Sequence, residues 1–322
     1  MDYSGYLAAL GTSVCYACGS VFFTISGRTV SSIVVNRTRL IMALVILMII
    51  HLISFGTLFP FGAEPERFVW LGLSGIVGLA LGDFFLFQAF VLIGPRLTML
   101  IFALSSVLSA ILAFIFLQQV LTPTQILGIL VTVGGIALVV TEPRPEEKEK
   151  SIPKVETPAM VVAADETATV GNQPITQAVY VRGLFFAFLA ACGQAVGTIL
   201  SKLGMVGDYS PFSANAIRMT AAVIAIWAVT VFNRQVGYTI NQVRNHPRAV
   251  LQMLVGTILG PVSGVLLSLY SVQHAPVGIA STLSSLMPIF LIPISFVAFG
   301  ERITLRGVIA TVIVVVGITM LV

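Results

Sequence analysis

Ten runs of mainly apolar residues, each close to the length of a membrane-spanning helix, constrain the fold of this chain more than any other feature. The hydrocarbon core of a bilayer requires about 20 apolar residues per helix. Most turns between the runs are short, so successive helices are expected to be antiparallel neighbours. The sequence predicts an all-α integral membrane protein with ten transmembrane helices, at about 4–26, 31–55, 68–92, 97–117, 123–141, 181–203, 211–232, 249–272, 276–298 and 304–322.

The scarcity of charge supports this interpretation and excludes other classes of protein. Only 9% of the 322 residues are charged and 57% are hydrophobic, whereas soluble domains are about 25% charged. Such a chain cannot cover a soluble surface, which excludes a soluble enzyme and a disordered protein. The net charge of +4 forms no basic stripe, so nucleic acid is not an expected partner. Three cysteines predict neither a disulfide framework nor a metal site.

One segment, residues 143–178, differs from the rest in composition. It holds five of the 15 prolines and ten charged residues, and it cannot bury enough apolar surface to fold alone. We expect it to be a disordered, solvated linker. It divides the chain into a first five-helix repeat (1–142) and a second (179–322).

The two halves resemble each other in sequence. Equivalent positions are Cys18 and Cys192, Asn36 and Asn215, Arg39 and Arg218, Gly78 and Gly260, and Gly82 and Gly264. Each repeat has an odd number of spans, so the second copy starts on the opposite side of the membrane from the first. The two repeats are therefore expected to be inverted. Inverted repeats are typical of transporters, with the substrate site near the bilayer midplane. Duplication retained only for packing is the alternative.

Three charged residues inside the runs are the first candidates for a binding site. Charge is costly inside a membrane, and Arg39 and Arg218 each follow an Asn (Asn36 and Asn215) by three residues. Two guanidinium groups facing one cavity would bind a carboxylate or phosphate. The alternative is that both arginines snorkel to lipid headgroups.

Asp83 is the one acidic residue clearly within a run. It would suit coupling to a proton or the binding of a cationic substrate. The alternative is a structural ion pair with an arginine such as Arg39.

Further candidates are polar residues within the runs and residues near their ends. The cavity candidates are Tyr16, Gln88, Gln194, Tyr270, Ser284 and Ser285, each of which could instead form an interhelical hydrogen bond. Near helix ends, Glu301 is expected to cap the tenth helix or, with Arg302, to form a salt bridge at a gate. Lys202 is expected to anchor a helix end at the interface, and Pro288 to break the backbone hydrogen bonding of the ninth run.

Several segments resemble the ten-helix, EamA-type group of the drug/metabolite transporter superfamily. They are CYACGS with NRTR, LGDFFLFQAFVLIGPR, ACGQAVGTILSK with NAIRM, LGPVSGVLLSLY, and STLSSLMPIFLIPISFVAFGERITLRG. The resemblance implies a bundle around a central cavity and the efflux of small metabolites. The first half departs from the pattern, because Ser106 and Gln119 stand where the second half has Pro288 and Glu301.

We therefore expect a secondary transporter that exports amino acids or related small carboxylates, with the two five-helix halves rocking in alternating access. The chain has no zinc-protease, Walker or nucleophile-elbow motif, so we expect no enzyme activity, no cofactor and no metal. The expected partners are the lipid bilayer of a bacterial or archaeal inner membrane and a small-molecule substrate. Coupling to a proton or counter-substrate and the oligomeric state are left open. The alternatives are a carrier of cationic or lipophilic compounds that uses Asp83, and a non-transporting scaffold or lipid-handling protein.

The orientation in the membrane is also open at this point. Basic residues flank the odd-numbered turns far more often than the even-numbered ones, which places the linker in the cytoplasm. The family resemblance implies the reverse, with cytoplasmic termini.

Overall fold

The computed structural model describes residues 4–117, 122–140, 177–206, 209–274, 283, 286–300 and 304–320. Within these ranges all regular elements are helices. They are α1 (Ser4–Val30), α2 (Ser32–Phe55), α3 (Pro65–Ser74), η1 (Gly75–Gly82), α4 (Asp83–Ile93), α5 (Pro95–Phe102), α6 (Leu104–Leu117), α7 (Pro123–Val140), α8 (Gln177–Gly204), α9 (Pro211–Phe232), α10 (Val236–Asn245), α11 (Pro247–Thr257), η3 (Ile258–Gly264), α12 (Val265–His274), α14 (Met287–Phe299) and α15 (Leu305–Thr319).

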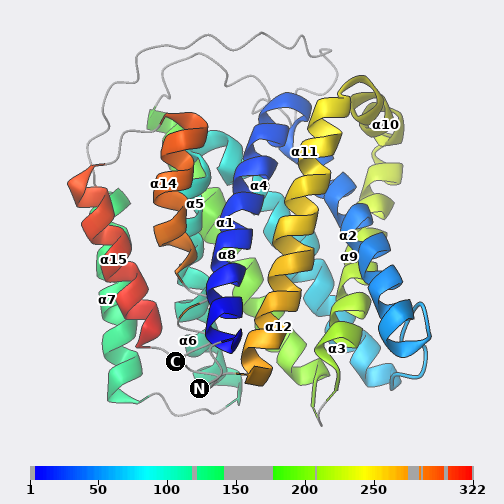
Figure 1. Cartoon of the computed structure of the whole chain (residues 1–322), viewed down its shortest axis with the longest axis horizontal. Helices are drawn as coiled ribbons and strands as arrows, with labels where there is room; N and C mark the ends of the chain where they lie inside the picture. The colour runs from blue at the N-terminus through cyan, green and yellow to red at the C-terminus, as the bar shows by residue number, and fades with distance from the viewer. Residues whose placement is uncertain are drawn as a thin grey trace.

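The helices form an upright bundle, with the start of α1 and the end of α15 at the same end (Figure 1). Among the described residues, seven continuous helical segments are long and apolar enough to cross a membrane, and three further apolar helices are shorter. Each expected run therefore coincides with apolar helix. Of the ninth run, α14 (Met287–Phe299) is described, whereas most of residues 276–286 lie outside the described residues. The sixth begins at Gln177, so the last two residues of the expected linker are helical, and the others lie outside the described residues.

Two of the spans contain a π-helical segment at equivalent repeat positions. η1 ends at Gly82 and η3 ends at Gly264, the two glycines that the repeat alignment pairs. Pro261 lies inside η3 and has no N–H to donate, which accounts for one of the two widened turns. Segments of π-helix often mark functional sites, and η1 leads directly into Asp83.

The first helix of each half packs against the third span of the other half. A Cβ atom at Gly19 of α1 would lie 3.1 Å from the Cα atom of Gly260 in η3, and one at Gly193 of α8 would lie 3.0 Å from the Cα atom of Gly82 in η1. Gly82 and Gly260 therefore lie in close helix contacts, which small residues usually form in lipid. Helices α1 and α8 therefore each pack mainly against the half of the chain to which they do not belong.

The last helices of the two halves, α7 and α15, lie side by side at one edge of the bundle (Figure 1). Their contact also relies on small residues. A Cβ atom at Gly128 would lie 2.7 Å from the backbone oxygen of Gly317. The hydroxyl group of Thr132, which lies in this contact, donates to the backbone oxygen of Gly128 over 2.8 Å.

Replacing Gly193 by valine is expected to destabilise the bundle by about 1–3 kcal/mol, the usual cost of overpacking. The atoms that the new side chain meets are backbone atoms of Gly82 and Val77, which cannot move aside as a flexible side chain would. Thermal unfolding in detergent measures the effect. Gly134→Val is the matched control, because a Cβ atom at exposed Gly134 meets nothing within 4 Å. Equal melting temperatures for the two variants would contradict the close α8–η1 contact.

Candidate functional site

An ion pair between Arg39 of α2 and Asp83 at the start of α4 lies inside the bundle. An Arg39 guanidinium N–H donates to the Asp83 carboxylate, and the two side chains are only 6% and 12% exposed. Arg39 therefore does not snorkel to the headgroups. Of the two alternatives for Asp83, the structure shows the ion pair.

Neighbouring groups hold Arg39 in place. Its Nη2 lies 3.4 Å from the Oδ1 atom of Asn36, and the Nδ2 atom of Asn36 donates to the backbone oxygen of Ala80, in η1, over 3.4 Å. The guanidinium group lies 4.9 Å from the ring centroid of Phe87 and 5.8 Å from that of Phe23. The charge of an arginine packed between aromatic faces and paired with a carboxylate is compensated without a ligand, although the Nε atom of Arg39 has no hydrogen-bond partner among the described residues.

Arg218 of α9 lies next to this pair but is not part of it. A Cβ atom at Gly78 would lie 3.7 Å from both the Nη2 atom of Arg218 and the Oε1 atom of Gln194, so these two side chains converge over a glycine of η1. The Arg218 charge interacts electrostatically with Asp83 and with Tyr16. Its Nε atom is buried and has no hydrogen-bond partner within the described ranges.

These residues form one group, which we call the central charge cluster: Arg39, Asp83, Arg218, Asn36, Gln194 and Tyr16. Its members come from α1, α2, α4, α8 and α9, and so from both halves of the chain. The cluster holds two cations and one anion, which leaves one positive charge without an ionic partner in it. The structure thus shows the Arg39–Asp83 ion pair that was the alternative to a binding role for Asp83, and it places Arg218 beside this pair; that the cluster binds a substrate stays a prediction.

The two halves do not contribute equally to the cluster. Asn36 is fully buried and hydrogen-bonds Arg39, whereas its repeat equivalent Asn215 is only partly buried, and the structure gives it no hydrogen bond in the described residues. Gln88 is buried on α4. The two repeats therefore differ at this position. Arg39 has an ion pair with Asp83 and a hydrogen bond to Asn36, whereas Arg218 has neither among the described residues.

Three further predicted residues lie away from the cluster. Tyr270 is not a cavity residue: it is 43% exposed near the end of α12, where its hydroxyl group lies 3.2 Å from the Oγ atom of Ser4. Pro288 lies in the first turn of α14, where its missing N–H breaks no helical hydrogen bond. Lys202 is exposed in the last turn of α8, as expected of an interfacial anchor.

The cap expected of Glu301 is provided by Thr304, because α15 begins only at Leu305 and the Thr304 hydroxyl group accepts from the N–H of Gly307 over 3.1 Å. Glu301 itself lies outside the described residues, as do the other three remaining candidates, Ser284, Ser285 and Arg302.

The sequence reasoning missed a contact between the halves at the α10 end of the bundle. The Arg37 guanidinium group, on α2, donates to Thr239 Oγ1 over 2.9 Å and to Gln235 Oε1 over 2.5 Å. We call this contact the Arg37 latch. The signal was available, because Arg37 is a charged residue within an apolar run.

A second contact between the halves lies at the opposite end, where α2 finishes. The imidazole Nδ1 of His51 lies 2.6 Å from the backbone oxygen of Thr57, and its Nε2 lies 3.2 Å from the Oγ atom of Ser213 on α9. Nearby, Arg67 donates to the backbone oxygen of Val206 over 2.8 Å. We call the His51–Ser213 contact the His51 latch. Here the signal was a histidine within an apolar run.

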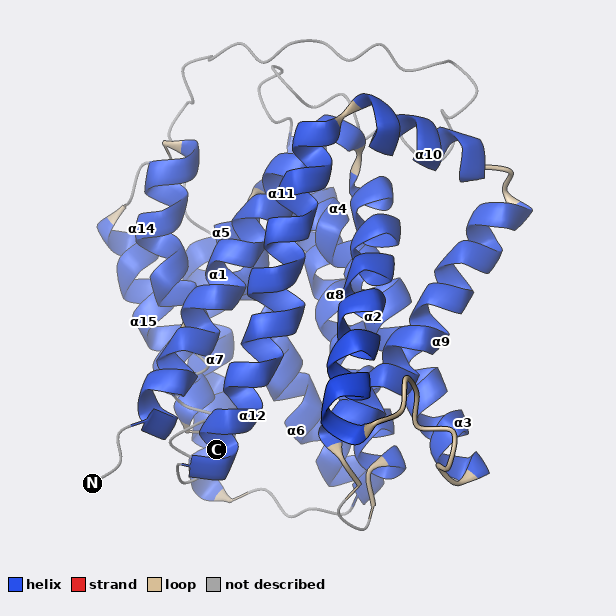
Figure 2. Ribbon diagram, turned by 45° about the vertical axis from the view of Figure 1, so that its right-hand side comes forward, coloured by secondary structure: helices blue, strands red, loops and turns tan. Residues whose placement is uncertain are grey.

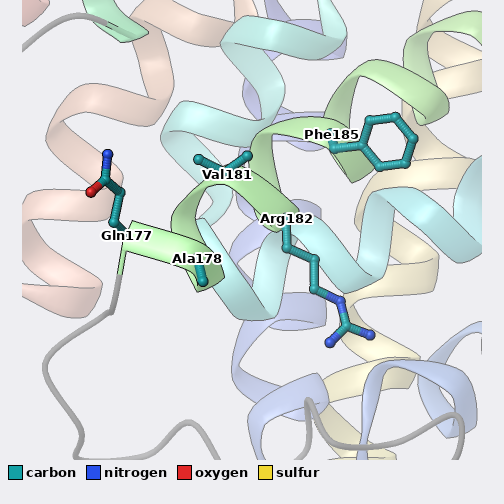
Figure 3. Close-up of a pocket in the computed structure, with 5 residues that line it drawn as sticks. All are labelled: Gln177, Ala178, Val181, Arg182 and Phe185. Atoms are coloured by element: carbon teal, nitrogen blue, oxygen red, sulfur yellow. The ribbon is translucent and has the colours of Figure 1, made fainter.

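A groove of about 660 Å³ lies on the outer surface at the start of α8, lined by Gln177, Ala178, Val181, Arg182 and Phe185 (Figure 3). It is separate from the central charge cluster, because Phe185 precedes Gln194 by nine residues, or about 13 Å along the helix. Among the described residues, no group of three or more His, Cys, Asp or Glu side chains could hold a metal ion.

Comparisons with known proteins agree with this architecture. A crystal structure of a protein superimposes with a TM-score of 0.54 at 16% sequence identity, over 98% of this chain and 95% of that chain, which shows the shared fold. A search of curated proteins gave no match. The family model for the EamA-like transporter family matches twice, over residues 3–141 and 181–322. The chain therefore belongs to the EamA-like transporter family.

Proposed function

We propose that this protein is a gradient-driven exporter of small carboxylates, such as amino acids or related metabolites, and that Arg218 binds the substrate carboxylate. The observation that carries the proposal is the Arg218 guanidinium group, which lies beside a complete ion pair and has a buried Nε atom without a partner in the described residues. Export is the direction that the family resemblance favours.

The balance of charge in the cluster supports a ligand with one carboxylate for this site. Asp83 already neutralises Arg39, so one positive charge remains in a low-dielectric environment, where an uncompensated charge is costly. A carboxylate bound to Arg218 would bring the cluster to neutrality, and a guanidinium group can hold it through two parallel hydrogen bonds. Gln194 and Tyr16 would contribute neutral polar contacts to the rest of the ligand.

The alternative of a cationic substrate has less support. It requires the Asp83 carboxylate, which is engaged by Arg39 and has Arg218 as a second positive neighbour. A cation would have to displace Arg39 while remaining close to Arg218. A purely structural scaffold has no evident need for Arg218 in the bundle interior. If transport is coupled to a proton, Asp83 is the group we propose, because its protonation would release Arg39.

Support for inverted repeats and alternating access comes from the pairing between the halves. The π segments fall at equivalent positions, and α1 and α8 pack reciprocally. The Arg37 and His51 latches each join the two halves, one at each end of the bundle. In our proposal both latches are closed when the cluster is occluded, and each opens in turn.

Breaking one latch is expected to open one side only. In a chain whose three cysteines are replaced by serine, Gln194→Cys would report access to the cluster for a membrane-impermeant maleimide. Arg37→Ala removes two hydrogen bonds, which should raise labelling from the α10 end about tenfold or more. His51→Leu should do the same from the opposite end. If both variants increased labelling from the same side, the two contacts would not be opposing gates.

Binding is tested first with the purified full chain in detergent. Its thermal stability is measured against a panel of amino acids, other small carboxylates, organic cations and neutral metabolites. A ligand at about 100 times its Kd should stabilise the protein by about 2.7 kcal/mol, and any hit is then tested for flux in proteoliposomes. A hit among carboxylates supports the proposal, whereas hits confined to cations would favour the Asp83 alternative. No flux of a bound carboxylate would favour a protein that does not transport it.

A further inference from the structure

The short helix α10 lies across one end of the bundle, between α9 and α11 (Figure 2). It was not predicted from sequence, because it is only ten residues long and carries few apolar side chains. Exposed arginines surround it: Arg234 before it, Arg244 in its last turn, and Arg248 at the start of α11. None of their three guanidinium groups has a hydrogen bond or ion pair within the part of the chain that the structure describes.

The local sequence offers these arginines no acidic partner. Between Asp208 and Glu301 the chain contains no aspartate or glutamate. At the opposite end of the bundle the arrangement is different, because Arg67 there donates to two backbone oxygens and lies 3.3 Å from a carboxylate oxygen of Glu64. Within the described ranges the three guanidinium groups around α10 therefore have no anionic partner, whereas Arg67 is bound within the protein.

One face of α10 is fixed to the bundle. Thr239 is buried and accepts from Arg37, and Tyr238 and Val243 pack against the largest apolar core, which includes Met253 of α11. The other face is exposed and includes Ile240, which is 57% exposed, next to Asn241 and Arg244. The arginines are thus presented from a rigid, amphipathic surface helix.

The mixture of apolar and basic groups identifies the partner. Phe232, at the end of α9, is 88% exposed and stands two residues before Arg234. Exposed Phe and Ile side chains beside arginines fit the boundary between acyl chains and headgroups, where amphipathic helices lie. Basic residues near a membrane surface attract anionic lipids. An acidic protein or a nucleic acid would leave Ile240 and Phe232 in water.

We propose that α10 and its flanks form a binding surface for anionic phospholipid, in which Arg234, Arg244 and Arg248 contact headgroup phosphates and Ile240 and Phe232 contact acyl chains. The lipid would hold α10, and with it the Arg37 latch, against the end of the bundle. This proposal does not depend on the identity of the transported substrate.

The experiment titrates the detergent-solubilised full chain with phosphatidylglycerol, phosphatidylcholine or inorganic phosphate and follows melting temperature and bound lipid by native mass spectrometry. We expect phosphatidylglycerol to bind and stabilise the protein more strongly than phosphatidylcholine. The triple variant Arg234→Gln, Arg244→Gln, Arg248→Gln should lose this preference, with an affinity for phosphatidylglycerol lower by about fivefold per arginine, or about 100-fold in all.

The control is Asn241→Ala, which changes an exposed but uncharged residue of α10 and should leave phosphatidylglycerol binding unchanged. It is compared with the single variant Arg244→Gln, whose affinity for phosphatidylglycerol should fall about fivefold. Unchanged phosphatidylglycerol affinity in a folded triple variant would overturn the proposal. Equal stabilisation by phosphatidylcholine would reduce the surface to an apolar contact, and equal stabilisation by inorganic phosphate would make it a free-anion site; either result overturns it too.

Discussion

Replacing Arg218 by glutamine is expected to weaken binding of small carboxylates by about 100-fold or more while the protein stays folded. Loss of one charged partner from a buried, hydrogen-bonded pair costs about 2–5 kcal/mol. Folding should not suffer, because the free protein has no ion pair to Arg218 and its Nε atom already lacks a hydrogen-bond partner among the described residues. The free energy of unfolding should therefore be unchanged or slightly higher, and calorimetric titration with the carboxylate found in the panel measures the loss of affinity.

Two control variants test whether the loss of affinity is specific to the Arg218 guanidinium group. Arg218→Lys keeps the positive charge but loses the planar fork, so its affinity should fall between those of the wild type and Arg218→Gln. Asn215→Ala removes the neighbouring polar side chain on α9, for which the structure shows no hydrogen bond in the described residues, and should have little effect. An Arg218→Gln protein that binds carboxylates as tightly as the wild type would remove the basis of the proposed function.

Replacing Asp83 by asparagine is expected to be strongly destabilising, by about 3–5 kcal/mol, because it leaves the buried Arg39 charge without its counter-ion. Arg39 is held in place by Asn36, Phe23 and Phe87 and cannot reach water without disturbing the core. Thermal unfolding of the ligand-free protein in detergent measures the effect. The same change raises the charge of the cluster, so Asp83→Asn protein that remains folded should favour ligands with two negative charges.

The double variant Arg39→Gln, Asp83→Asn tests whether the loss of stability comes from breaking the ion pair or from any change of the side chain at position 83. It removes both charges together, so much of the lost stability should return. The site keeps the Arg218 charge, so carboxylate binding should also persist. If the double variant were no more stable than Asp83→Asn alone, the ion pair would not be the cause of the loss. If it lost all carboxylate binding, Arg39 would be a substrate contact.

The spans and their packing could be predicted well from sequence because both depend on local properties. Membrane-length apolar runs reveal the helices, and the glycines at 82 and 260 indicate close packing because they have no side chain. The prediction failed where a helix is very short and where the residue that holds it lies far away in the sequence. Ten residues of mixed polarity do not reveal whether they form a helix such as α10, which is fixed by Arg37, about 200 residues earlier.

The candidate site was predictable in its composition, and the Arg39–Asp83 pair was one of the stated alternatives, but the sequence alone does not decide between them. Charges inside a membrane span must find partners or a wet cavity, which identified Arg39, Arg218 and Asp83. The two arginines occupy equivalent repeat positions, so the sequence gives no reason for Asp83 to choose one of them. The choice depends on three-dimensional neighbours, namely Asn36 on the same helix as Arg39 and Gly78 beneath Arg218. Tyr270 was misplaced because polarity alone does not distinguish the middle of a bundle from its end.

The reciprocal packing of α1 and α8 has a consequence for how the chain is made. Helix α1 can pack against its partner glycine, Gly260, only after about 230 further residues have been translated. The first half is therefore inserted before α8, which packs against η1, has been synthesised. The two halves should be stable only together. Cutting the chain between 143 and 176 and expressing both pieces in one cell should yield an assembled protein, whereas either piece alone should be degraded.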